Sequence, residues 1–178
     1  MIYISTGGVS NKPAFETSKL LIEAGVKYIE LSGGAFHSNN LAELKKLKRE
    51  AVFKIHNYFP PPKTPFVFNL ASKNPEISKL SEAHAKKAIV WATELDCNSY
   101  SFHAGFLLDP KVEELGRKVG KRELLNRDEG LKIFLDKVNK LSNYAEKLGV
   151  ELMIENNVLS LNNSIEFKGN PFLMTHLE

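Results

Sequence analysis

The sequence has one cysteine, Cys97, among 178 residues. A single thiol excludes a disulfide within the chain and is compatible with a reducing compartment, so we interpret Cys97 as a small buried core residue. No segment approaches the roughly 18 to 20 unbroken apolar residues of a membrane helix, and the N-terminal residues lack the pattern of a secretory signal. We therefore expect a cytoplasmic protein without a membrane partner.

A large charge of one sign is also missing, because 24 Lys and Arg residues against 21 Asp and Glu residues leave a net charge of +3. This balance argues against a nucleic-acid partner without excluding one. One segment is locally basic, but acidic residues alternate with its cations, so we interpret it as an exposed charged face, with contact to a sugar phosphate or a DNA backbone as the alternative. Its basic members are Arg117, Lys118, Lys121, Arg122 and Arg127. No glycine-rich nucleotide-binding motif is present.

Short apolar runs alternate with longer segments of helical periodicity, which is typical of an α/β fold with a parallel sheet. The helical periodicity is clearest over 128–148, where apolar residues recur at spacings of three and four. Gly25 and Gly149 stand where helices would end. The expected strands are 2–5, 28–31, 52–55, 99–102 and 151–154, and the expected helices are 14–24, 41–49, 78–95 and 128–148.

The connection after the third strand contains three consecutive prolines, Pro60 to Pro62, and predicts a long ordered loop. Without a linker or a second type of composition, residues 1–178 are expected to form a single domain. Five βα units cannot close a barrel, which needs eight. Thr175 and Glu178 have the spacing of a helix-capping box, so we expect that the chain stops early, as a helix begins.

Polar residues follow three of the expected strands: His56, His103 and Glu155. Because the carboxyl ends of parallel strands meet at one edge of the sheet, these side chains are expected to converge. Two imidazoles and a carboxylate form a borderline ligand set, suited to Zn²⁺, Mn²⁺ or Co²⁺ with water completing the shell. Taken singly, each of these residues has a structural role as its alternative, as a hydrogen-bonded histidine or an ion-paired glutamate. The sequence therefore predicts a divalent metal site.

The segments that contain these residues resemble a known family. Ile55 to Pro62, Phe102 to Phe106 and Ile154 to Asn157 are similar to the strand ends of xylose isomerase-like TIM barrels, and Tyr28 to Gly34 is similar to the second strand of that family. The superfamily contains sugar phosphate isomerases and epimerases and also endonuclease IV. The resemblance implies a partial TIM barrel, made of the first five βα units.

The resemblance also implies roles for individual residues. His56, His103 and Glu155 are similar to metal ligands, and Glu155 is in addition expected to be catalytic, next to the sugar hydroxyls. The implied reaction is metal-assisted proton transfer at carbon. His37, Asn57, Asn156 and Asn157 are the expected substrate-binding residues, and an orienting role toward Glu155 stays open for Asn156 and Asn157. The remaining ligands and the second carboxylate of the family follow later strands that this sequence does not contain.

Three hypotheses follow. The first is a metal-dependent isomerase or epimerase of carbohydrate metabolism, with a small sugar or sugar phosphate as its substrate. The second is an apurinic-site endonuclease, a zinc phosphodiesterase in which the two histidines would serve in a metal cluster. The third is a catalytically inactive barrel fragment. Because an open sheet leaves an apolar edge exposed, we also expect a homo-oligomer or a dependence on the missing C-terminal half.

Overall fold

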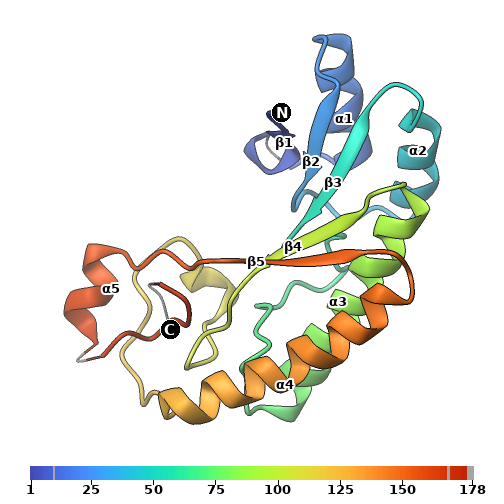
Figure 1. The fold of residues 1–178 in the computed structure, drawn as a ribbon. Coiled ribbons are helices and arrows are strands. Elements are labelled where there is room, and N and C mark those ends of the chain that lie inside the picture. The colour runs from blue at the N-terminus through green and yellow to red at the C-terminus, as the bar shows by residue number, and fades with distance from the viewer. Residues whose placement is uncertain (10, 168, 176–178) are drawn as a thin grey trace. The chain divides into compact units, whose positions relative to one another are not determined.

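The computed structural model describes residues 1–9, 11–167 and 169–175. Strands and helices alternate along the chain (Figure 1). The strands are β1 (Ile4–Ser5), β2 (Tyr28–Leu31), β3 (Val52–His56), β4 (Ser99–His103) and β5 (Glu151–Glu155). The α-helices are α1 (Ala14–Glu23), α2 (Asn40–Leu47), α3 (Pro75–Glu94), α4 (Arg127–Glu146) and α5 (Leu161–Glu166), and two short 3₁₀ helices are η1 (Thr6–Gly8) and η2 (Val112–Glu114).

The five strands form one sheet in the order β1-β2-β3-β4-β5. The β1-β2, β2-β3 and β3-β4 pairs are parallel, and Glu30 lies opposite Lys54 while His56 lies opposite Ser101. This open parallel sheet with connecting helices confirms the predicted fold class. Within residues 1–9, 11–167 and 169–175, β1 and β5 stand at the two ends of the order and each has a neighbouring strand on one side only.

Alternation along β2 and β3 separates a buried face from a more accessible face. Ile29 and Leu31 on β2 and Phe53 and Ile55 on β3 are buried. The intervening residues are more accessible, and the last of these on β3 is His56. Successive side chains of a strand point to opposite faces, so His56 lies on the more accessible face of β3, together with Lys54.

The strand β2 has the predicted bounds, whereas β1 covers only Ile4–Ser5 of the predicted 2–5. The strands β3, β4 and β5 each extend one residue further than expected, so His56, His103 and Glu155 are the last strand residues. The predicted helix ends at Gly25 and Gly149 are confirmed, since both glycines have positive φ, 85° and 68°.

The chain folds into two compact units. The first contains Met1–Thr64, Lys86–Phe102 and Tyr144–Met153, and the second contains Pro65–Ala85, His103–Asn143 and Ile154–Glu178. The first unit includes most of the sheet with α1 and α2. The second has its own apolar cluster, made of Leu108, Val119, Phe167 and Phe172. The expectation of a single domain stays a prediction.

The segment between β5 and Thr175 was not predicted to be structured. It contains α5 and returns to the residues after β4, where Phe106 and Phe172 form an antiparallel bridge. The predicted capping box cannot be followed, because 176–178 lie outside the described residues. Within the described ranges, no helix combines the length and the hydropathy needed to cross a membrane.

Candidate metal centre

His56 occupies the end of β3, where it is half-buried. Its Nδ1 lies 3.1 Å from Oγ of Ser101, the residue opposite it on β4. The next residue, Asn57, has a positive φ of 40°, and its carbonyl oxygen accepts a hydrogen bond from the Tyr100 hydroxyl at 3.0 Å. Contacts with β4 therefore hold the backbone before and after His56, since Ile55 pairs with Tyr100 and Asn57 accepts the Tyr100 hydroxyl.

His103 and Glu155 end β4 and β5, and both are half-buried. A ring nitrogen of His103 and a carboxylate oxygen of Glu155 lie within 4.8 Å of each other. The backbone holds the two residues together, because the N–H of Ala104 donates to the Glu155 carbonyl at 3.2 Å. His103 Nδ1 also lies 3.3 Å from the carbonyl oxygen of Asn156. A nitrogen and a carboxylate donor thus stand side by side in the second unit.

The residues expected to bind substrate differ in their surroundings. Asn156 is exposed, whereas Asn157 is buried with its side-chain amide against backbone carbonyls. His37 lies in the exposed loop before α2, where its ring packs against Phe15 with ring centres 5.2 Å apart. Its Nδ1 accepts the N–H of Asn39 at 3.2 Å. Substrate contact by these residues stays a prediction.

Sequence reasoning missed a polar network in the second unit that centres on Asn69. This residue is 1% exposed. Its Oδ1 accepts the N–H groups of Ala71 and Phe106, and its Nδ2 donates to Asp109 at 2.9 Å. The Asp109 carboxylate also accepts the Ser72 hydroxyl at 2.8 Å. In the sequence, the only sign of this network is that Asn69 is a polar residue within the apolar run Phe66 to Leu70.

The same network borders a cavity of about 650 Å³ within the second unit. Asn69, Ser72 and Asp109 line it together with Arg122 from the long loop between β4 and α4. The charged and amide groups named here already bond to one another or to backbone. The cavity lies beside the β4–α4 loop and is also lined by apolar residues such as Leu107 and Leu125.

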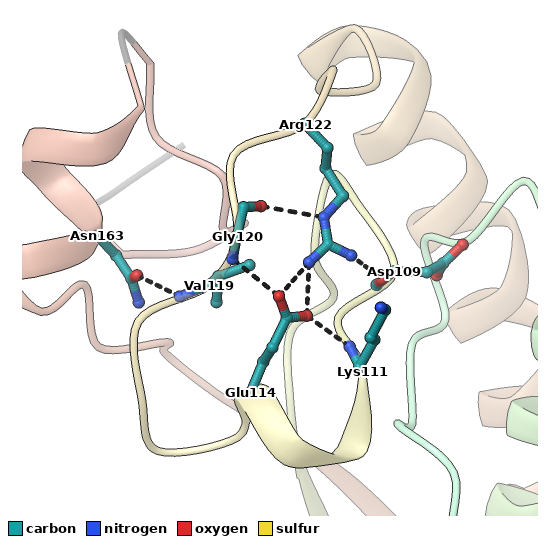
Figure 2. Close-up of polar contacts among 7 residues, drawn as sticks. All are labelled: Asp109, Lys111, Glu114, Val119, Gly120, Arg122 and Asn163. Carbon is teal, nitrogen blue, oxygen red and sulfur yellow. Dashed lines mark hydrogen bonds and ion pairs between the residues drawn. The ribbon is translucent and has the colours of Figure 1, made fainter.

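The basic segment has a structural role that the sequence did not indicate. The Arg122 guanidinium pairs with the Glu114 carboxylate and donates to the carbonyl oxygens of Asp109 and Gly120 at 3.1 and 3.0 Å (Figure 2). Arg127 donates to the carbonyls of Asn170 and Phe172. The interpretation of these two arginines as part of an exposed charged face is therefore wrong, because both are half-buried and bonded to backbone.

Glu114 is the acceptor at the centre of this arrangement. It accepts the backbone N–H of Lys111 at 2.7 Å and that of Gly120 at 2.8 Å (Figure 2). These backbone hydrogen bonds, followed by the Arg122 guanidinium, lower the pKa of Glu114 to about 2. The β4–α4 loop is thus fastened by an ionised carboxylate.

The chain resembles a D-tagatose 3-epimerase-like protein, with a TM-score of 0.61 and 20% identity over 94% of this chain and 54% of that one. An L-ribulose 3-epimerase gives a TM-score of 0.63 and 17% identity over 87% and 49% of the two chains. A Thermus thermophilus protein soaked with ZnCl₂ gives 0.53 and 21% over 88% and 55%.

The chain spans about half the length of these solved structures. A search of curated protein sequences gave no match. The family described as xylose isomerase-like TIM barrel matches residues 19–164, which is most of the chain and includes all three predicted metal ligands. The chain belongs to the xylose isomerase-like TIM barrel family.

Proposed function

We propose that this chain provides the metal-binding strand ends of a metal-dependent isomerase or epimerase that acts on a sugar or sugar phosphate. The observation that carries the proposal is the pair His103 and Glu155, whose ligand atoms lie within 4.8 Å of each other. The similarity to an L-ribulose 3-epimerase and to a D-tagatose 3-epimerase-like protein supports a sugar as the substrate class.

The donor atoms fit a divalent cation. Two ligand atoms at about 2.1 Å from a Zn²⁺ ion stand at most about 4.2 Å apart, so a small side-chain adjustment would allow His103 and Glu155 to bind one ion. We propose His56 as the third ligand, because it ends the strand next to β4. Imidazole and carboxylate donors suit Zn²⁺, Mn²⁺ and Co²⁺.

The Ser101 contact supports this assignment of His56. Ser101 and His103 are two residues apart on β4, so their side chains leave the same face of the strand. His56 lies opposite Ser101 and directs Nδ1 to its hydroxyl. Nε2 is then the ring nitrogen proposed to bind the metal, since a ligating histidine commonly uses its other nitrogen for such a hydrogen bond.

Chemically, a bound divalent cation would supply polarisation of a carbonyl or hydroxyl pair on the sugar, which acidifies the neighbouring C–H. Glu155 is proposed to accept that proton on its carboxylate and to deliver it to the neighbouring carbon during isomerisation. Asn57 and Asn156, with His37, are proposed to hydrogen-bond sugar hydroxyls and so orient the carbon that loses its proton.

Titration with Co²⁺, followed by calorimetry and by visible absorption, tests the site. We expect one Co²⁺ per chain, and we expect His103→Ala and Glu155→Gln each to abolish or strongly weaken binding. Glu151→Gln is the matched control, because it changes an exposed glutamate at the opposite end of the same strand. Absence of stoichiometric Co²⁺, or equal binding by all variants, would contradict the proposal.

Turnover is proposed for the complete protein, because the chain spans about half the length of the structures it matches. The metal-loaded protein should interconvert ketose epimers or aldose and ketose pairs, with or without a phosphate, and should leave an abasic DNA duplex intact. Incision of that duplex at the abasic site would instead favour the endonuclease hypothesis. Cytoplasmic location and homo-oligomer formation stay predictions.

A further inference from the structure

Asn157 is buried, with 7% of its surface exposed, although it lies in a segment without regular secondary structure. Its side-chain Nδ2 donates to the carbonyl oxygen of Ala104, to that of Gly105 at 3.3 Å and to that of Leu173 at 3.0 Å. All of these residues belong to the second unit. One side chain therefore joins three segments that are distant in the sequence.

The partners of Asn157 lie next to the proposed metal ligands. Asn157 follows Glu155 by two residues, and Ala104 and Gly105 directly follow His103. The same strand ends are connected by the hydrogen bond from the Ala104 N–H to the Glu155 carbonyl at 3.2 Å. The Asn157 amide therefore bridges the two backbones at the point where both ligands leave them.

The chemistry of this contact requires an amide. All three partners are carbonyl oxygens, which only accept hydrogen bonds, and the Asn157 NH₂ group has two N–H donors, so one donor is shared. An aspartate of the same shape would direct a carboxylate oxygen at three carbonyl oxygens, and these groups would repel each other because none of them donates a hydrogen bond. An alanine would leave the buried carbonyls without this donor, which is costly in a site shielded from water.

We propose that Asn157 is a positioning residue of the metal site. Its amide fastens the end of β4 to the end of β5 and so fixes the separation of the His103 and Glu155 ligand atoms. A metal site needs its ligands within about 0.5 Å of the productive geometry, and the residues that support ligands set this precision. The inference rests on the proposed function, because it concerns the ligands of that same site.

Co²⁺ binding by the full chain tests this role. Asn157→Asp is expected to weaken Co²⁺ affinity about 10- to 100-fold and to change the visible spectrum of the bound ion. Asn157→Ala introduces no repulsion and should lose less Co²⁺ affinity than Asn157→Asp. It provides the test if the aspartate variant does not fold. Wild-type affinity and an unchanged spectrum in a folded Asn157 variant would overturn the proposal.

Asn163→Ala is the matched control. Asn163 is also buried in the second unit, at 5% exposed, and its Oδ1 accepts the N–H of Val119 at 2.9 Å. This substitution should lower the melting temperature as the Asn157 variants do, yet leave Co²⁺ affinity within about threefold of the original value. Equal loss of Co²⁺ affinity in Asn163→Ala would mean that general destabilisation, not positioning, explains the effect.

Hydrogen exchange of the metal-free chain separates this inference from the proposed function. The backbone amide of Ala104 donates to the Glu155 carbonyl, and its protection factor should fall at least tenfold in Asn157→Asp and Asn157→Ala. In Asn163→Ala the protection factor should fall at Val119 instead. If the unmodified chain binds no Co²⁺, the proposed function fails, and exchange still decides whether Asn157 holds the strand ends. Unchanged protection at Ala104 would overturn the positioning role.

Discussion

Ser101 Oγ lies 3.1 Å from His56 Nδ1, across the paired strands β3 and β4. A hydroxyl at this distance fixes the orientation of the imidazole and determines which ring nitrogen is left for other partners. The contact is a direct result of strand register, since the two residues lie opposite each other in the sheet.

Ser101→Ala is therefore expected to weaken Co²⁺ affinity about 10-fold, because the His56 ring loses a hydrogen bond that orients it. Ser99→Ala, on the same strand, is the control and should leave the affinity unchanged. Calorimetric titration of both variants measures the difference. Equal affinities in the two variants would argue that His56 is not a ligand.

Gly105 lies where the two long loops of the second unit approach closely. A Cβ built on it would come within 2.7 Å of both the Ala71 Cβ and the Asn69 Oδ1, and within 3.0 Å of the Ala71 backbone nitrogen. Gly105→Ala should therefore reduce the free energy of unfolding by about 1–3 kcal/mol, as overpacking does. Gly8→Ala, where a Cβ meets nothing within 4 Å, is the control. Chemical denaturation of both variants checks the prediction.

The loop held by Glu114 should respond to acid. Its folded pKa of about 2 lies below the ordinary value of 4.5, so the folded state favours the ionised carboxylate. This contribution to stability is present above about pH 4.5 and is lost as the pH falls toward 2. In Glu114→Gln that acid-dependent loss should disappear, whereas substitution of the neighbouring exposed Glu113 should preserve it. Hydrogen exchange at the Gly120 amide between pH 5 and 2.5 follows the loop directly.

Cys97 should be inert in the folded protein. Burial raises the pKa of its thiol to about 12 from an ordinary value of 9.0. A thiol-specific disulfide reagent at pH 8 should therefore react slowly with the native chain and rapidly after denaturation. Fast labelling of the native protein would show that Cys97 is more accessible than its 5% exposed surface indicates.

The same shift predicts alkaline destabilisation. Above about pH 9 the unfolded state loses the thiol proton while the folded state keeps it, so stability falls as the pH rises from 9 toward 12. Burial also raises the pKa of Tyr100, which acts in the same direction. Denaturant titrations at pH 8 and pH 10.5 should give a lower midpoint at the higher pH, and part of the decrease should be absent in Cys97→Ala.

The alternation of strands and helices, the helix ends at two glycines and the strand-end positions of His56, His103 and Glu155 were predictable from the sequence. Each depends on a local rule, because hydrophobic periodicity and backbone preference act over a few residues. Even so, the apolar periodicity over 128–148 does not separate buried from exposed residues, because Phe134 and Leu141 are buried but Leu135 is 46% exposed.

Hydrogen bonds between distant segments could not be predicted. For Asn157 the sequence left a sugar hydroxyl or Glu155 as the partner, and it gave no sign that the amide is bonded to carbonyls more than fifty residues earlier in the chain. Arg122 was assigned to an exposed charged face, yet it pairs with Glu114. No local pattern distinguishes an amide or a guanidinium that binds backbone from one that faces solvent.

The order of strands and helices and the chemical character of the strand ends were thus readable from the amino-acid sequence. Which residues hold those ends in place, how the β4–α4 loop is fastened and where the chain after β5 returns became known only from the folded chain. Periodicity depends on neighbours along the chain, whereas the partners of buried polar groups belong to segments that meet only on folding.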